Sequence, residues 1–116
     1  MINPLILLPI IVGPILILTG LLLKKFPPRK MNILYGYRTA SSMKNQEQWD
    51  FAQRFAAVES MRLGVILTLC VIPLYYYNPA DEIMLLVSLG LMLITFIILI
   101  VRVELAIKTR FNKKEK

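Results

Sequence analysis

The chain divides into three long apolar blocks, separated by polar stretches that hold all of its charged side chains. The blocks without Asp, Glu, Lys or Arg cover residues 1–23, 63–80 and 83–101. They are 23, 18 and 19 residues long, and a helix needs about 20 residues to cross the hydrocarbon core of a bilayer. This pattern predicts a single all-α integral membrane domain, 1–116, with transmembrane helices at about residues 3–23, 60–77 and 83–102.

The first apolar block is expected to be a membrane span and not a signal peptide. Signal peptides carry positive charge before the apolar run and small residues after it. Here residues 1–4 are uncharged, and Lys24 and Lys25 follow the run. The hydrophobic fraction of the chain, 57%, also exceeds the roughly 45–50% of ordinary soluble domains.

The positive charge of the chain is distributed in the way that sets membrane orientation. Of the fourteen Lys and Arg residues, eight lie in 24–62 and six in 102–116, and the turn between the last two blocks carries only Asp81 and Glu82. Cytoplasmic segments of membrane proteins are enriched in Lys and Arg. We therefore expect the loop and the C-terminus in the cytoplasm, the N-terminus outside, and the net charge of +7 to favour anionic lipid over nucleic acid.

Residues 24–59 are predicted to form a cytoplasmic loop followed by a helix. Pro27 and Pro28 stop the first span, and Asn45 with Gln48 has the spacing of a helix-capping pair. Within this helix Trp49, Ala52, Ala56 and Glu59 would share one face. The pattern leaves open whether the helix lies on the membrane surface or continues into the second span, and it assigns residues 103–116 to a solvated basic tail.

The second span carries small side chains every four residues, at Ser60, Gly64 and Thr68. Small residues at this spacing allow another membrane helix to approach closely. We expect a helix contact on this face, which could also join two copies of the chain in a homo-oligomer.

Catalytic and metal chemistry finds little support in the composition. The chain has no histidine and one cysteine, Cys70, which lies in the second apolar block. Metal sites of ordinary spacing, nucleophile–base pairs and glycine-rich phosphate loops have no counterpart in the sequence. We expect neither an enzyme nor a cofactor.

The cytoplasmic loop holds the main candidate site. Its side chains combine aromatic rings, one guanidinium and several hydroxyl or amide groups, in Tyr35, Gly36, Tyr37, Arg38, Thr39, Ser42, Asn45 and Trp49. One interpretation is structural: Gly36 adopts a backbone angle closed to other residues, and Arg38 pairs with Glu59 or with helix carbonyls. The other is a binding site in which Arg38 and its polar neighbours hold a carboxylate or a lipid phosphate.

These residues resemble the signature of the SdpI family of bacterial membrane proteins. The resemblance rests on Pro27-Pro28, Asn32, Tyr35-Gly36-Tyr37-Arg38-Thr39, Ser42-Met43-Lys44-Asn45 and Trp49 followed by Ala52. The chain departs from the pattern at Gln53, where Asn is expected, and at Ala57, near an expected glycine-like position. The family is named for an immunity protein that protects its own cell against a secreted killing peptide and holds a transcriptional repressor at the membrane, and that protein has additional spans before the shared region.

The resemblance implies a bacterial cell-membrane protein that confers immunity or resistance by binding a membrane-active peptide. A second hypothesis is a signalling scaffold whose basic loop recruits a cytosolic regulator. A third is a subunit of a small transporter.

Overall fold

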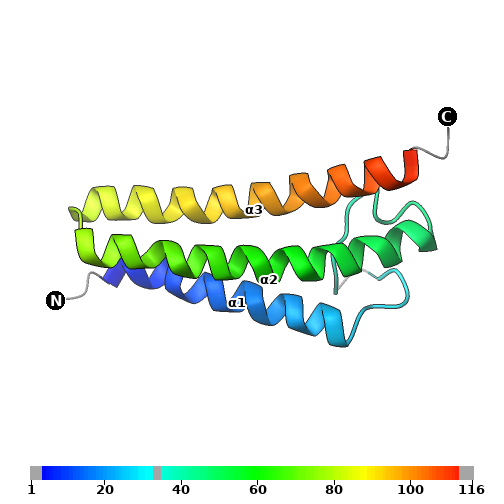
Figure 1. Ribbon diagram of the computed structural model, residues 1–116, viewed down its shortest axis with the longest axis horizontal. Helices are drawn as coiled ribbons and strands as arrows, with labels where there is room; N and C mark the ends of the chain where they lie inside the picture. The colour runs from blue at the N-terminus through cyan, green and yellow to red at the C-terminus, as the bar shows by residue number, and fades with distance from the viewer. Residues whose placement is uncertain (1–3, 33–34, 113–116) are drawn as a thin grey trace.

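The computed structural model describes residues 4–32 and 35–112 as three long helices that run side by side. A short 3₁₀ helix, η1 (Pro4–Ile6), leads into α1 (Leu7–Lys25), and α2 (Gln46–Tyr77) and α3 (Asp81–Asn112) follow. Figure 1 shows α2 between α1 and α3, with the two termini at opposite ends of the molecule. All three helices are long and apolar enough to cross a membrane, which confirms the predicted all-α membrane fold.

Local sequence signals set the ends of α2. The Asn45 side chain accepts a hydrogen bond from the backbone N–H of Gln48 at 2.8 Å, as the capping spacing predicts. At the other end Asn78 adopts a left-handed conformation, with φ 45°, and its N–H donates to the carbonyl of Leu74. A short turn at 78–80 therefore reverses the chain into α3.

The structure resolves the open question about residues 45–59 in favour of one continuous helix. Helices α2 and α3 each contain 32 residues, about 48 Å at 1.5 Å per residue. The hydrocarbon core is only about 30 Å thick, so both helices extend beyond it at the end that carries the loop.

The expectation of a solvated tail at 103–116 is wrong for residues 103–112. Val103 and Ile107 are buried, and they form an apolar cluster with Ala52 and Ala56 of α2. The apolar side chains that recur after Arg102 keep α3 helical because they have a partner surface on α2. Residue 3 of the first predicted span and residues 113–116 of the tail lie outside the described part of the chain.

Small residues bring α1 and α2 into close contact. A Cβ atom added at Gly64 would lie 2.6 Å from the carbonyl oxygen of Gly13, and one added at Gly20 would lie 2.5 Å from that of Ala57. The Ser60 hydroxyl donates to the carbonyl of Leu16 at 2.8 Å across the same interface. The predicted helix contact is confirmed. Its partner is α1 of the same chain, so this face of α2 is covered and does not provide an interface for a second copy.

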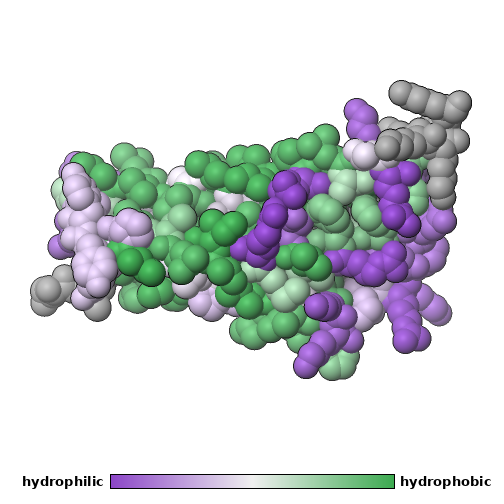
Figure 2. Space-filling view, viewed as in Figure 1, coloured by the Kyte–Doolittle hydropathy of each residue, from purple (hydrophilic) through white to green (hydrophobic). Residues whose placement is uncertain are grey.

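The remaining helix surfaces are apolar along the middle of the molecule. Exposed Leu, Ile, Val and Phe side chains cover the outer faces of all three helices. Figure 2 shows this hydrophobic surface in the centre, with hydrophilic side chains gathered at the end that carries the loop. Lipid is the solvent that such a surface requires.

The α1–α2 contact predicts a large difference between two glycine substitutions. Gly64→Ala forces backbone atoms of the two helices apart, and overpacking of this kind costs about 1–3 kcal/mol. Gly90 on α3 has no atom within 4 Å of an added Cβ, so Gly90→Ala serves as the matched control. We expect a lower thermal unfolding midpoint in detergent for Gly64→Ala alone. Equal midpoints for the two variants would contradict the close contact.

Candidate functional site

The carboxylate of Glu104 holds the loop between α1 and α2 against α3. Three loop hydroxyls donate to its two oxygens: Tyr37 at 2.7 Å, Thr39 at 2.9 Å and Ser41 at 2.5 Å. Hydrogen bonds to an ionised group are shorter and stronger than those between neutral groups. Residues more than sixty positions apart in the chain are thereby fixed in one unit.

The Tyr37 phenol remains a donor in this arrangement at neutral pH. Burial, together with the hydrogen bond to Glu104 and the charge of that carboxylate, raises the pKa of Tyr37 far above its ordinary value. A deprotonated phenol would face the carboxylate as a second anion. The loop is thus held by a protonated tyrosine over the whole physiological pH range.

Gln53, a side chain of α2, binds the backbone of the same loop. The Gln53 amide accepts from the N–H of Tyr37 and donates to its carbonyl, both at 2.7 Å. Gly36 has φ +105°, and a Cβ there would lie 2.6 Å from the Gln53 Oε1 and 2.8 Å from the Pro28 Cγ. The predicted backbone role of Gly36 is confirmed, and the departure from the family pattern at Gln53 falls on a residue that binds the loop directly.

Trp49 anchors the start of the loop. Its ring is completely buried, and its Nε1 donates to the carbonyl of Pro28 at 2.6 Å. Ser42, also buried, accepts from the N–H of Thr39 at 2.8 Å and closes the following turn. Trp49 therefore contacts the loop and not the surrounding bilayer. Ala57, the other departure from the family pattern, is buried against α1 near Gly20.

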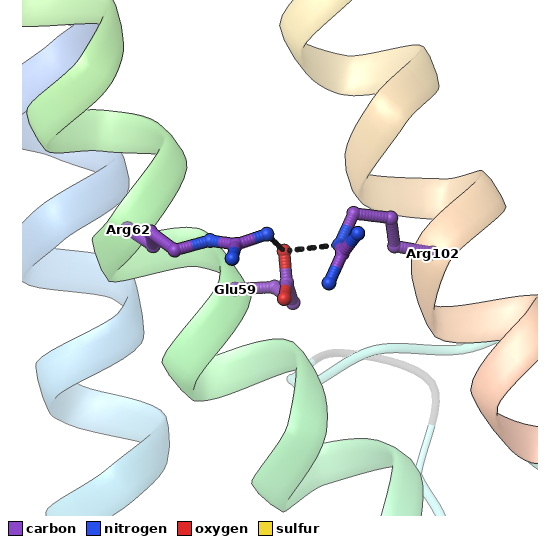
Figure 3. A network of polar contacts seen from close by, with 3 residues as sticks. All are labelled: Glu59, Arg62 and Arg102. Atoms are coloured by element: carbon purple, nitrogen blue, oxygen red, sulfur yellow. Dashed lines mark hydrogen bonds and ion pairs between the residues drawn. The ribbon is translucent and has the colours of Figure 1, made fainter.

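The predicted pairing of Arg38 with Glu59 is wrong. Glu59 is buried between two other arginines, accepting from Arg62 at 2.9 Å and from Arg102 at 3.0 Å (Figure 3). Arg38 is exposed, and within the described residues its guanidinium has no ion pair or hydrogen bond. The structural interpretation of the loop holds for Tyr37 and Thr39, which bind Glu104, and for Ser42, which binds the loop backbone. It fails for Arg38.

Several residues that organise the site were not predicted from the sequence: Ser41, Gln53, Arg62, Arg102 and Glu104. Glu104 carried the clearest available signal, because it is an isolated acid followed by a run of cations. An acid in that position needs compensating donors when it is partly buried. Its donors lie in the loop, and no local pattern identifies them.

An apolar groove of about 310 Å³ lies beside the loop. Helix α1 contributes one wall, with Ile15 and Thr19 among its lining residues, while Phe96 and Leu99 of α3 form the other. Tyr35, Gly36 and Tyr37 of the loop line the groove as well, together with Ala56 and Ser60 of α2. The groove is therefore apolar along the helices and bounded at one end by the loop residues Tyr35, Gly36 and Tyr37.

The model of the SdpI/YfhL protein family matches residues 29–102. The chain belongs to the SdpI/YfhL family. The matched segment includes the loop, the whole of α2 and most of α3 with Arg102, and it ends just before Glu104.

One family relative is a protein of Bacillus subtilis (strain 168) with the name "Uncharacterized protein YfhL". It is 40% identical to the chain over 55 residues, which are 47% of this chain and 50% of that protein. The similarity thus spans about half the length of the curated relative. No solved structure matches the chain.

The hydroxyl contacts predict that Glu104 keeps the loop at residues 37–41 in one conformation. Glu104→Gln leaves too few acceptor positions for three hydroxyl donors, and losing charge-assisted hydrogen bonds costs about 2–3 kcal/mol. We expect amide hydrogen exchange of residues 37–41 to become about 30- to 160-fold faster. Lys108→Gln, one turn away on the exposed side of α3, is the control. Unchanged exchange in Glu104→Gln would show that Gln53 alone holds the loop.

Proposed function

We propose that the protein is a membrane-embedded resistance factor that protects the cell against a secreted membrane-active peptide. It would act by binding the peptide, without catalysis. The observation that carries this proposal is membership of the SdpI/YfhL family across residues 29–102, the part of the chain that builds most of the ordered site.

The groove between α1 and α3 supports the proposal as a place for such a peptide. Its lining is apolar, and Ile15 at its edge is 52% exposed, so an occupant could enter from the lipid phase. Apolar side chains of a membrane-active peptide would replace lipid against these walls. Tyr35 and Tyr37, held by the loop contacts, would define the end of the site.

The orientation of the protein is part of this proposal. All fourteen Lys and Arg residues lie on the loop side of the apolar blocks, so the loop would face the cytoplasm and the 78–80 turn the outside. A peptide arriving from outside would meet the outer turn first and reach the groove through the bilayer.

The binding proposal predicts that filling the groove abolishes protection. Ile15→Trp places a large ring in the groove, where it takes the place of part of the peptide. The lost apolar contacts are worth about 1–2 kcal/mol, which lowers the affinity for the peptide about tenfold. Ile11→Trp, one turn away and equally exposed but outside the groove lining, is the control. The measurement is growth of a sensitive bacterium that expresses each variant, challenged with a secreted membrane-active peptide at matched membrane levels.

Protection by the original chain and by Ile11→Trp, with loss in Ile15→Trp, is the expected result. Full protection by both variants would exclude the groove as the binding place. Failure of the original chain to protect against any peptide tested would contradict the proposed function itself and favour the scaffold hypothesis.

The proposed orientation predicts opposite labelling of two introduced cysteines. Glu82→Cys and Lys108→Cys, each in a Cys70→Ala background, place single exposed thiols at the two ends of α3. A membrane-impermeant thiol reagent should label position 82 in intact cells and position 108 only after lysis. Labelling of position 108 from outside would reverse the orientation.

A further inference from the structure

Four arginines lie along the same side of the α2–α3 pair. Arg54 and Arg62 lie on α2 with Val58 between them at spacings of four residues, and Arg102 and Arg110 lie on α3. The two helices are antiparallel, because only the short turn at 78–80 separates them. Arg62 and Arg102 meet at Glu59, and Arg54 and Arg110 line a common hollow, so the arginines form two pairs about 12 Å apart along the helices.

A groove lies between these two pairs. Two adjoining hollows of about 510 and 350 Å³ share Phe51, Phe55 and Arg110 as lining residues. Figure 2 shows a hydrophilic group over α2 and α3 with hydrophobic surface on either side of it. The floor is therefore aromatic and aliphatic while the rims are cationic, and we call this feature the arginine groove.

The charge of the arginine groove is not balanced by its own residues. Glu59 is the one carboxylate among the described residues that line the two hollows, and it already accepts from both Arg62 and Arg102. Four guanidinium groups and one carboxylate leave three positive charges. The guanidiniums of Arg62 and Arg102 remain about half exposed, so they retain N–H donors for an anion.

The depth of the groove corresponds to the lipid headgroups. Arg102 follows Asp81, the first residue of α3, by twenty-one positions, which is about 32 Å along the helix. A hydrocarbon core of about 30 Å that begins near Asp81 would end at Arg102. Exposed Ile66 and Ile98 lie one turn from Arg62 and Arg102 toward the membrane centre and would meet the upper acyl chain. The arginines would meet the phosphate layer, with Val58 and Leu105 between the two pairs.

Arg110 is oriented for this task by the groove's own aromatic side chains. Its guanidinium carbon lies 5.1 Å from the ring centroid of Phe51 and 5.9 Å from that of Phe111. Stacking on a ring leaves the edge of a guanidinium free to donate in its plane. The planar fork of an arginine matches two phosphate oxygens, which a lysine ammonium does not.

We propose that the arginine groove binds the phosphate group of an anionic phospholipid at the end of the bilayer where the loop lies. The phosphate would lie between the two arginine pairs, with the acyl chains along the exposed apolar faces of α2 and α3. This site is separate from the peptide groove, which lies between α1 and α3, and it does not depend on the proposed resistance.

The test measures how lipids stabilise purified protein in detergent. Thermal unfolding is followed while phosphatidylglycerol, phosphatidylcholine or inorganic phosphate is added. We expect phosphatidylglycerol to raise the midpoint and the other two to have little effect. In R54Q/R110Q the apparent affinity for phosphatidylglycerol should fall at least about tenfold, because two sets of charge-assisted hydrogen bonds are lost.

Two further variants separate a specific site from general attraction of a basic protein for anionic lipid. K24Q/K25Q removes the same charge from the exposed end of α1 at the same side of the membrane, and it should bind like the original chain. R54K/R110K keeps the charge and should still bind phosphatidylglycerol several-fold more weakly, because the bidentate geometry is lost. This variant also tests the site if R54Q/R110Q does not fold.

Three results would overturn the proposal. Equal weakening by K24Q/K25Q and R54Q/R110Q would reduce it to general electrostatic attraction. An equal response to phosphatidylcholine would remove the preference for an anion. Stabilisation by inorganic phosphate alone to the same extent would show that the groove binds a free anion and not a lipid.

Discussion

A single carboxylate determines how the loop is arranged against the helices of this protein. Glu104 accepts hydrogen bonds from Tyr37, Thr39 and Ser41, and these three residues belong to a segment with little regular structure of its own. A segment of this kind stays in one conformation only if its contacts offset the entropy lost on ordering. Glu104 can serve as that contact because α3 continues past the membrane, and α3 continues because Val103 and Ile107 pack on α2.

Two acids at the end of the molecule that carries the loop, the buried Glu59 and the partly buried Glu104, are satisfied in different ways. Glu59 lies between two arginines from α2 and α3, so its partners are charged and half exposed. Glu104 is held by hydroxyl groups of the loop, with no ion pair in the described contacts. The first arrangement joins two helices and leaves positive charge at the membrane surface. The second joins a loop to a helix and leaves Arg38 of the loop exposed.

Features that depend on neighbouring residues in the chain could be predicted from the sequence. The cap at Asn45, the backbone angle of Gly36 and the close helix contact at Gly64 each follow from one residue type in a recognisable local pattern. The pairing of Arg38 with Glu59 could not be decided in this way. It depends on which cation the fold brings to Glu59, and Arg102 reaches it from forty-three positions away.

The same distinction explains the missed residues. Gln53 and Glu104 have ordinary helical positions, and their partners lie in the loop at separations of 16 and more than 60 residues. The tail was expected to be solvated because its charge dominates its composition. Val103 and Ile107 recur at helical spacing within it, but their burial requires that α2 also project from the membrane, which the sequence left open.

The continuity of α2 has a mechanical consequence. From Gln46 to Tyr77 the backbone is helical throughout, with Pro73 close to the Tyr77 end, so this end and the residues that hold the loop belong to one continuous helix. A tilt or rotation imposed near Tyr77 moves Trp49 and Gln53 through a related displacement at the other end. The loop and the turn at the opposite end of the molecule are therefore joined through one helix, which packs closely on α1 at Gly64.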